Sequence, residues 1–334
     1  MKIEIITSIN AEMKETGFGS ELACHDVFAS LTLMGHLVQV TVCATMADLQ
    51  SVVHRKPDLV ILAAKYMSFE NADDVWFSEY FAQNNITFSG SSRVTLKYDS
   101  DKVLAKLHLA SLGINTAKHF TAIPNQYSVE AELPFSFPLF VKPIDAANGN
   151  GIDDQSFVEN FSEFEAKVLS LYAIYRQPIL VEEYLGGREF TVAVIENGCG
   201  EMKVSAIELV PPLSSGSLRI LGESVKKLDT ETLKEIEINQ IGAVKDLAAL
   251  SFKGLGARGF GRIDVKMDSK GLCYFMEANL VPGMNRTSSY FPKACQMANE
   301  MSYDEVIEHM LDESFDRVIA KQEFTNLYNQ ELAS

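Results

Sequence analysis

A stretch in the last third of the chain, ARGFGRIDVKMDSKGLCYFMEANL, carries acidic, basic and amide side chains at alternating positions. Because side chains alternate along a β-strand, Arg262, Asp264 and Lys266 share one face. The letters DSKG predict a hairpin with a two-residue turn at Ser269 and Lys270. The cross-strand pairs expected from this turn are Met267–Leu272, Asp264–Phe275 and Arg262–Glu277. The hairpin therefore gathers charged side chains from two strands on one face.

This register makes Asp264 and Glu277 diagonal neighbours, roughly 7 Å apart at Cβ, with Asn279 on the same face. Two carboxylates and an amide oxygen form a hard donor set that suits Mg²⁺, or Mn²⁺ in its place. The Arg262 guanidinium beside them can hold an anion bridged to the metal, such as a phosphoryl group in transfer. The alternative is a surface hairpin whose charges face water. A loop rich in donors follows and favours a site; it contains Asn285, Arg286, Thr287 and Ser288.

The segment LFVKP and the loop after it could bind phosphate. Lys142 ends an apolar strand, and the loop AANGNG places Gly149 and Gly151 where backbone amides can approach phosphate oxygens. A simple glycine turn between strands explains the loop equally well. It is not a Walker A loop, because GxxxxGK[ST] is absent, and no dinucleotide fingerprint GxGxxG follows the first strand.

The segment VEEYLGGREFTV places Glu182 and Glu189 on either side of a glycine turn. One carboxylate could accept a hydrogen bond from an exocyclic amine and the other from ribose hydroxyls, which leaves a strand edge for adenine. Two solvated glutamates explain the same pattern equally well. The segment is informative only together with its neighbours.

Composition limits the classes of function. The chain has 334 residues, 47% of them hydrophobic and 22% charged, which is ordinary globular usage. Its formal net charge of −16 argues against non-specific binding to nucleic acid, but not against a small phosphate ligand. No apolar run is long enough to span a membrane, and the five cysteines have no CxxC spacing. We therefore expect a reduced, cytoplasmic protein with neither nucleic-acid nor membrane partners.

Periodicity indicates the elements that must position these residues. In the first third, short apolar strands alternate with helical patterns, which predicts a parallel sheet covered on both faces. The strands expected there are 2–6, 37–43, 58–63 and 86–88, and the helices are 21–34 and about 73–83. Asp99 and Ser100 are expected to cap a helix that ends near Leu112.

Strands and helices of a different order follow. The expected strands are 139–143, 179–185 and two antiparallel strands within 189–210, with a turn at 197–200. Ser162 with Glu165 predicts a capping box for a helix to about 175, and Ser302 with Glu305 predicts another. A long helix is expected over about 232–250, before the hairpin.

In their order and spacing, LFVKP, the glycine loop, LVEEYLGGREFTV, GFGRIDV and FMEANLVPGM resemble the ATP-grasp enzymes, most closely the D-alanine–D-alanine ligase group. The resemblance extends over about residues 95–312. It implies an α/β plus α+β protein: an ATP-grasp fold behind an N-terminal parallel-sheet domain. The implied regions are the N-terminal α/β domain on the substrate side (1–95), the small subdomain with the glycine loop (96–185), the catalytic subdomain with the Mg²⁺ site (186–315) and a peripheral C-terminal tail (316–334).

The resemblance also implies roles for single residues. In that family's pattern, Lys102 and Lys142 would contact the phosphates of ATP, together with Asn148 and Gly149 of the glycine loop. Glu182 would contact the adenine amine, and the backbone of Glu183 and Leu185 would contact the ring. Glu189 would bind the ribose. The implied Mg²⁺ ligands are Asp264, Glu277 and Asn279. Arg262 would lie beside an acyl phosphate, Gly283 would donate its N–H to the oxyanion, and Ser288 would lie near the carboxylate of the second substrate.

The departures from the ligase pattern gather where the amino-acid substrate should bind. TSINAEMKE stands in place of the family's glycine-rich strand exit, with Glu12 present and Lys14 close to the expected substrate-binding glutamate. AAKYMSFENADD replaces the family's HG-x-x-GEDG loop. The tyrosine-lysine lid is shortened to SSGSLRILGESVKKL, where Lys226 or Lys227 is expected to supply the cation.

We therefore expect an ATP-dependent ligase that joins a small amino acid or related carboxylic acid to an amine through an acyl phosphate. D-Alanine–D-alanine ligase itself is one alternative, and a nucleotide-binding protein that has lost ligation and serves regulation is another. The complete set of proposed metal ligands weighs against a non-catalytic protein, because mere binding has less need for it. The resemblance also allows a homodimer formed through the N-terminal domain.

Overall fold

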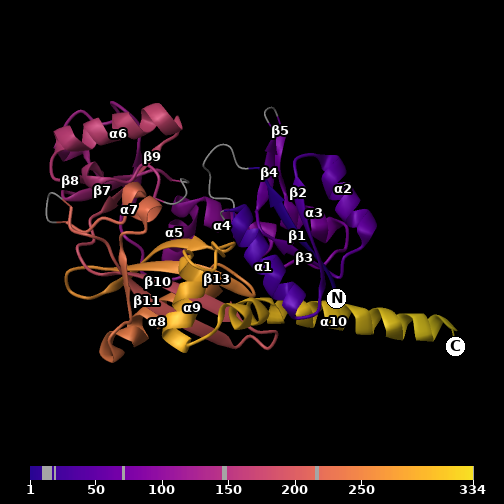
Figure 1. Ribbon diagram of the computed structural model, residues 1–334. Helices are drawn as coiled ribbons and strands as arrows, with labels where there is room; N and C mark the ends of the chain where they lie inside the picture. Colours follow the sequence, from indigo (N-terminus) through magenta and orange to yellow (C-terminus); the bar gives the residue numbers. More distant parts are fainter. Residues whose placement is uncertain (10–16, 19, 70–71, 145–148, 215–217, 334) are drawn as a thin grey trace.

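The computed structural model describes residues 1–334 except 10–16, 19, 70–71, 145–148, 215–217 and 334. Figure 1 shows three groups of elements: an N-terminal domain, a small upper subdomain around α6, and a lower sheet around β10 and β13. The helix α10 (Tyr303–Ala333) runs from the lower sheet beneath the N-terminal domain. Among the described residues, no helix is long and apolar enough to cross a membrane. All five cysteines are free, and only Cys199 is exposed.

The N-terminal domain is built on a parallel sheet, as predicted, with three of the four expected strands. Its strands are β1 (Lys2–Ser8), β2 (Leu37–Cys43) and β3 (Leu59–Leu62), in the order β2-β1-β3. The helices α1 (Glu21–Leu33) and α2 (Met46–Arg55) pack beside it. The sequence prediction omitted α2, which begins at a capping box formed by Thr45 and Asp48.

The predicted helix over about 73–83 is wrong in its first half. Residues Tyr66–Phe69 and Ala72–Trp76 form the antiparallel hairpin β4–β5, and α3 begins only at Phe77 and ends at Gln83. The hairpin fits the residues because Val75 and Trp76 prefer extended backbone. The strand predicted over 86–88 is also wrong, since only Phe88 makes a single parallel bridge, to Val60.

The helix expected after Asp99 is present as α5 (Lys102–Ser111), and a further helix that was not predicted, α4 (Arg93–Ser100), precedes it and contains Asp99. Asp101, not Asp99 or Ser100, caps α5 by accepting from the N–H of Leu104. Asp99 is buried instead, where its carboxylate pairs with the Nζ of Lys65 at 2.7 Å. It also accepts from the backbone N–H groups of Leu280 and Val281, so it joins the N-terminal domain to the segment just after the acidic hairpin.

The small subdomain is a four-stranded antiparallel sheet under α6 (Phe161–Tyr175). Its strands are β6 (His119–Ala122), β7 (Leu139–Lys142), β8 (Phe157–Val158) and β9 (Ile179–Glu183), in the order β6-β9-β7-β8. The helix begins two residues earlier than predicted because Asn160, not Ser162, caps it and bonds to Glu163. Two short 3₁₀ turns, Glu130–Glu132 and Asp154–Ser156, connect these elements.

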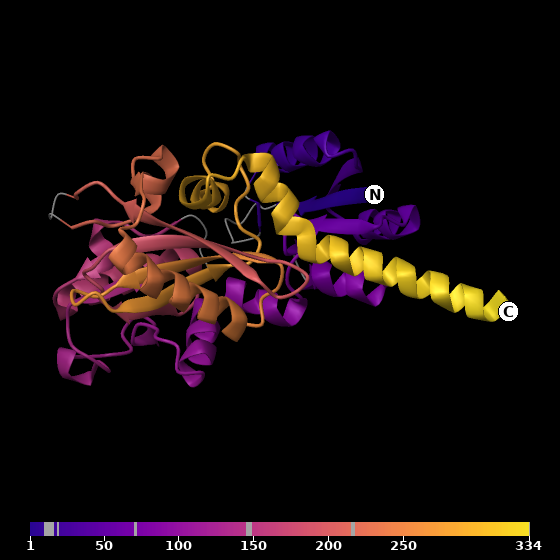
Figure 2. The same cartoon turned by 90° about the horizontal axis from the view of Figure 1, so that it is seen from below.

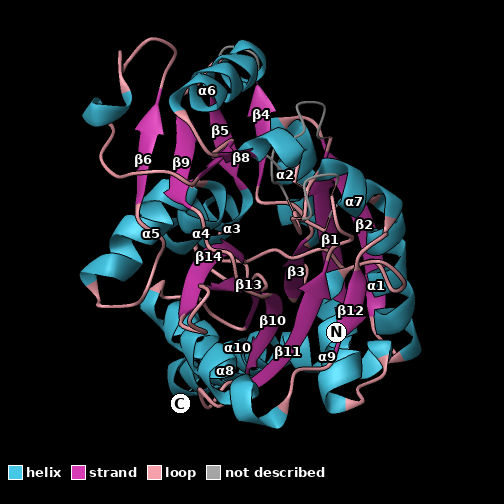
Figure 3. Ribbon diagram, turned by 90° about the vertical axis from the view of Figure 1, so that its left-hand side faces the viewer, coloured by secondary structure: helices cyan, strands magenta, loops and turns pink. Residues whose placement is uncertain are grey.

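The lower sheet has five antiparallel strands and is seen below the small sheet in Figure 3. Its strands are β10 (Glu189–Glu196), β11 (Met202–Val210), β12 (Thr232–Lys234), β13 (Phe260–Met267) and β14 (Cys273–Asn279), in the order β12-β11-β10-β13-β14. Around it lie α7 (Glu223–Leu228), α8 (Ile238–Gly254) and α9 (Tyr290–Asn299). The helix predicted from residue 232 begins only at Ile238, because Thr232–Lys234 extends the sheet by pairing with β11.

The hydrophobic core is divided in a way that matters for the site. One cluster runs without a break from the N-terminal domain, including Ile5 and Ile61, into the lower sheet, including Ile263 and Phe275. The small subdomain has its own cluster, which includes Val141, Phe164 and Val181. The last helix belongs to the larger body at its start and projects from it at its end (Figure 2). Ser302 and Glu305 cap its N-terminus as predicted.

Candidate active site

The acidic hairpin pairs in a different register from the one predicted. Asp264 lies directly opposite Glu277, and Arg262 opposite Asn279, because a bulge falls between Asp264 and Val265. The turn is also longer than two residues: Asp268 bonds to Leu272, and Gly271 takes a φ of +83°. The prediction that these four side chains share a face is confirmed. The carboxylates are nearer to each other than a diagonal pair would be.

Asp264 is held in place from two sides. Its Oδ1 accepts from Thr191 Oγ1 at 2.7 Å, and both oxygens accept from the Arg262 guanidinium at 3.0 Å. Burial raises the pKa of Asp264, and the facing Glu277 adds to this effect against the pull of Arg262. The arrangement therefore concentrates negative charge that a cation would relieve.

Glu277 is surrounded by cations. The Nζ of Lys102, at the start of α5, lies 3.3 Å from its Oε2. Burial alone would raise the pKa of Glu277, but Lys102, Lys226 and Lys142 hold it well below its ordinary value. Glu277 is therefore a carboxylate at neutral pH.

A second buried charge cluster lies where the small subdomain meets α5. Glu182 forms two ion pairs, one between its Oε1 and Lys106 Nζ at 2.8 Å and one between its Oε2 and Lys142 Nζ at 2.7 Å. Lys106 also donates a hydrogen bond to the carbonyl of Phe275. Burial opposes ionisation of Glu182, but the two lysines lower its pKa to about 2. Burial also lowers the pKa of Lys106. The sequence analysis did not select Lys106, whose position on α5 one turn after Lys102 was the available signal.

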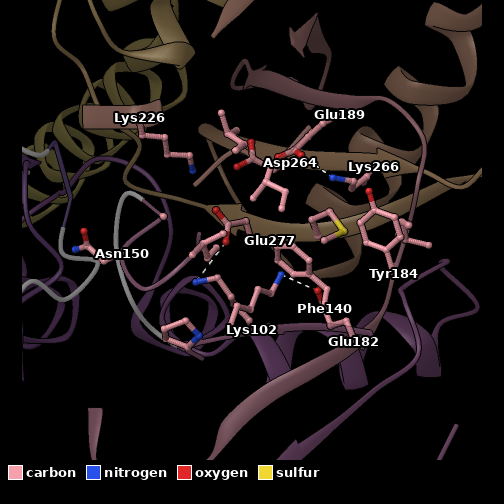
Figure 4. A pocket seen from close by; sticks show the side chains of 18 of the residues that line it. Lys102, Phe140, Asn150, Glu182, Tyr184, Glu189, Lys226, Asp264, Lys266 and Glu277 are labelled. Atoms are coloured by element: carbon pink, nitrogen blue, oxygen red, sulfur yellow. Dashed lines mark hydrogen bonds and ion pairs between the residues drawn. The ribbon is translucent and has the colours of Figure 1, made fainter. Parts of the chain in front are cut away.

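Residues from both clusters line one pocket between the small sheet and the lower sheet (Figure 4), with about 830 Å³ of space including its open side. Lys106 and Arg262 are not part of its wall. Its charged and polar wall is made by Lys102, Lys142, Asn150, Glu182, Glu183, Glu189, Lys226, Asp264, Lys266 and Glu277. Its apolar wall is made by Phe140, Pro143, Ile152, Tyr184, Leu185, Ile220, Leu221 and Met276, with Gly149 at the loop. A pocket of this size, lined by both apolar and charged side chains, suits a nucleotide.

The glycine loop reaches the pocket through Gly149, whose φ is +72°; Asn148 lies outside the described residues. A Cβ at Gly149 would meet the backbone of Gly222 at 3.2 Å and Lys226 Cδ at 3.3 Å, so only glycine allows this approach without a shift. The next residue, Asn150, was not selected from the sequence. It lines the pocket, and its buried Oδ1 has no hydrogen-bond partner within the described part of the chain.

The short helix α7 decides between the two lysines of the lid. Lys226 lines the pocket, whereas Lys227 pairs with Glu223 at 2.6 Å and its side chain is 60% exposed. Glu223 accepts from the N–H of Gly151, and its own N–H donates to Ile152. The lid and the glycine loop are thus bonded to each other.

Two residues expected at the second substrate lie outside this pocket. Ser288 donates both its hydroxyl and its N–H to Asn285 Oδ1, at 2.9 and 3.0 Å. Gly283 precedes that turn, where a Cβ would meet Ser289 Oγ at 2.9 Å. Both follow β14, but neither lines the pocket wall. Glu12 and Lys14 lie outside the described residues.

Among the described residues, no group of three or more His, Cys, Asp and Glu gathers as a metal cluster. A metal in the pocket would therefore rely on Asp264, Glu277 and the amide of Asn279. Asn279 is buried and stands opposite Arg262. The donor set is hard and all-oxygen, which fits Mg²⁺ better than a transition metal.

Two antiparallel sheets that close on one charged pocket, behind a parallel-sheet domain, define the ATP-grasp class of ligases. The family model described as "D-ala D-ala ligase C-terminus" matches residues 107–312, which is more than half of the chain. The chain therefore belongs to this family of ligases, and the resemblance noted in its motifs is confirmed.

Curated relatives agree. A D-alanine–D-alanine ligase of Stutzerimonas stutzeri is 28% identical over 69% of this chain and 70% of its own length. One from Gloeobacter violaceus is 26% identical over 95% of this chain and all of its own length.

Solved structures agree in fold. D-Alanine–D-alanine ligase from Bacillus anthracis, complexed with ATP, has a TM-score of 0.72 at 20% identity, covering 96% of this chain and 99% of its own. The Coxiella burnetii enzyme has a TM-score of 0.67 at 17% identity, covering all of this chain and 99% of its own.

Proposed function

We propose that this enzyme uses ATP to join the carboxylate of a small amino acid or related acid to an amine, through an acyl phosphate. The observation that carries the proposal is that four cations surround the facing carboxylates Asp264 and Glu277, and that three of the four line the pocket while Arg262 bonds to Asp264. The cations are Lys102, Lys142, Lys226 and Arg262. Such a set neutralises phosphate oxygens during transfer.

The nucleotide would lie along the pocket from its apolar to its charged end. Phe140, Tyr184 and Leu185 offer a surface for adenine, with Glu182 and the backbone of Glu183 at its polar edge. Glu189 would accept from the ribose. Lys102, Lys142, Lys226 and the amides of the glycine loop at Gly149 would bind the phosphates.

Asp264, Glu277 and Asn279 would hold Mg²⁺, with Mn²⁺ as the alternative ion. When bound, the ion would neutralise the phosphate charge that develops during transfer. The raised pKa of Asp264, caused by its burial and by the facing carboxylate, supports a role as a cation ligand. Arg262 is already oriented by Asp264 and would face the transferring group.

The reaction would proceed in two displacements. A substrate carboxylate oxygen bonds to the γ-phosphorus while the bond to ADP breaks. The amine nitrogen then bonds to the acyl carbon, phosphate leaves with the bonding electrons, and the amine proton goes to the departing phosphate. Closure of the lid and glycine loop would exclude water, which would otherwise hydrolyse the acyl phosphate. Gly283 and Ser288 remain proposed contacts for the oxyanion and the second substrate.

D-Alanine–D-alanine ligase is the second candidate, and the names of the relatives favour it. The substrate side differs, however. Lys65 lies in the segment that replaces the family's HG-x-x-GEDG loop, and its Nζ is fully buried against Asp99. A non-catalytic regulatory role is less economical, because mere binding does not need a facing pair of carboxylates.

The deciding experiment is phosphate release from ATP and Mg²⁺ over pairs of D- and L-amino acids, β-amino acids and small hydroxy acids, with mass spectrometry of the products. We expect turnover with at least one pair, giving an amide, ADP and phosphate. Turnover with D-alanine alone, giving the dipeptide, would select the second candidate. ATP binding without turnover on any pair would contradict the ligase proposal.

Glu277→Gln tests the metal assignment. We expect turnover to fall by at least about 100-fold, because several kcal/mol of charge stabilisation are lost. Circular dichroism should show an unchanged fold, and the exposed Glu235→Gln serves as the matched control. Turnover within a factor of two of the parent enzyme would contradict the role given to Glu277.

A further inference from the structure

A lysine inside the pocket has no role in the function described so far. Lys266 lies directly across from Glu189 in the pairing of β13 with β10, and its Nζ bonds to Glu189 Oε2 at 2.9 Å. Both side chains line the pocket and keep some exposure to it, 14% for Lys266 and 21% for Glu189. Figure 4 shows the pair joined by a dashed line, with Tyr184 beside Lys266.

The position of the pair along the sheet matches a sugar. Asp264, two residues before Lys266 on the same face, belongs to the charged end of the pocket. Tyr184 and Phe140 belong to the aromatic end. A nucleotide placed with its phosphates at Asp264 and its base at Tyr184 has its ribose between them, at Glu189 and Lys266 (Figure 4).

The surrounding backbone fixes this geometry. The N–H of Gly187 donates to the carbonyl of Met267, and the N–H of Met267 donates to Arg188. A Cβ at Gly187 would meet Asp268 O at 2.5 Å, so the glycine turn can dock on the end of β13 only without a side chain. The two polar groups are therefore preorganised and lose little entropy when a ligand binds.

The chemistry of the two side chains is complementary. A carboxylate only accepts hydrogen bonds and an ammonium only donates them, whereas each ribose hydroxyl does both. Glu189 alone could satisfy the hydroxyl protons but would leave the hydroxyl oxygens without a donor. Lys266 supplies that donor, since its Nζ already lies against Glu189 Oε2 on the pocket wall.

We propose that Lys266 is a specificity-determining residue which, together with Glu189, recognises the 2′- and 3′-hydroxyls of a ribonucleotide and disfavours 2′-deoxyribonucleotides. The inference rests on the proposed nucleotide site and adds to it. Lys266 and Glu189 still bond to each other when the 2′-hydroxyl is removed, but one further hydrogen-bonding position of this desolvated pair is then unfilled, and this costs more than the loss of a neutral contact.

Titration calorimetry with ATP and dATP in the presence of Mg²⁺ tests this proposal on the full chain. We expect the parent enzyme to bind ATP at least about ten-fold more tightly than dATP, as the loss of one charge-assisted hydrogen bond predicts. In Lys266→Met the ratio should fall to within a factor of two, mainly because ATP binding weakens. Lys266→Arg should keep most of the preference, and Lys270→Met, an exposed lysine in the turn of the same hairpin, should keep all of it.

The contrary outcomes are distinct. Equal weakening of ATP and dATP in Lys266→Met would mean that the lysine acts through charge alone and would overturn the proposal. A parent enzyme that binds both nucleotides equally would overturn it as well. Inorganic tripolyphosphate separates these results from a failure of the proposed function, because its binding should not change in Lys266→Met. A parent enzyme that binds neither ATP nor tripolyphosphate would refute the nucleotide site itself.

Discussion

Glu182 is fully buried, yet its carboxylate is ionised and forms ion pairs with two lysines. Taking three charges out of water is costly, and the cost is repaid only while all three are present. Glu182 and Lys142 belong to the small subdomain and Lys106 to α5, so the cluster also joins two parts of the molecule. Its protonation state is therefore a matter of stability as well as of nucleotide binding.

This cluster predicts a specific acid dependence. The pKa of Glu182 is lowered from 4.5 to about 2, so its contribution to stability is present above about pH 4.5 and is lost as the pH falls towards 2. Glu182→Gln leaves the two lysines uncompensated and should cost about 3–5 kcal/mol at pH 7. It should also flatten the fall in unfolding free energy below pH 4.5.

Urea unfolding at several pH values measures both effects, with the exposed Glu201→Gln as control. If the unfolding free energy fell equally steeply below pH 4.5 in the parent enzyme and in Glu182→Gln, the lowered pKa of Glu182 would be contradicted.

At this scale the sequence identified most of the charged pocket but not its geometry. Asp264, Glu277, Lys142 and Glu182 were found because strand alternation and motif order are local properties. The opposition of Asp264 and Glu277 was missed because the longer turn and the bulge each shift the register by one residue, and no residue type marks the bulge. Lys266 and Asn150 were missed because their role depends on which elements face them across the pocket.

The short helix α7 shows how an element selects between neighbouring residues of one type. One helical position turns the side chain by about 100°, so Lys226 and Lys227 cannot face the same way. Glu223, one turn earlier, bonds both to Lys227 and to the glycine loop, and this fixes which lysine enters the pocket.

Lys226→Met should therefore weaken ATP binding by about ten-fold, because a charge-assisted contact to phosphate is lost. Lys227→Met is the matched control and should change the dissociation constant by less than a factor of two. Calorimetric titration of the two variants in parallel gives the comparison. A larger loss in Lys227→Met than in Lys226→Met would reverse the orientation assigned to this helix.

The elements that were wrongly predicted share a physical cause. Residues around Asp99 and Ser162 offer more than one capping side chain, and tertiary contacts decide which one is used. Asp99 is unavailable as a cap because Lys65 and two backbone N–H groups from the segment after β14 bind it. The strand Thr232–Lys234 was read as helix because its pairing partner, β11, is distant in the sequence.

The whole molecule consists of two bodies in terms of its core. One face of the N-terminal sheet shares a hydrophobic cluster with the lower sheet, while the other face packs in a separate cluster that includes Ile6, Val60 and Phe77. The small subdomain shares neither of these clusters and has its own. The site is therefore divided: Asp264, Glu277 and Lys102 belong to the larger body, and Lys142 and Glu182 to the smaller one. Opening and closing of the pocket would move these two sets relative to each other.

Native-state hydrogen exchange can test this division. We expect amides of β7, β9 and α6 to exchange through a common opening that requires less free energy than exchange in β1, β3, β10 and β13. Nucleotide binding should slow exchange in the first group more than in the second. A single opening free energy for all seven elements would contradict the two-body description.

The continuous cluster has a further consequence for how such an enzyme can be recombined. Residues 1–95 look like a detachable module in the sequence, but their apolar side chains finish the core of the lower sheet, and Arg317 of α10 bonds to the carbonyl of Phe88. In a chimera that takes only this region from a relative, the apolar side chains of the new N-terminal domain would not match those of the lower sheet. A chimera that exchanges residues 119–183 replaces the hydrophobic core of the small subdomain as a unit. It would need chiefly to keep the polar contacts to the rest of the molecule, among them those of Lys106 and Glu223. The N-terminal region is thus less able than the small subdomain to be exchanged as a block.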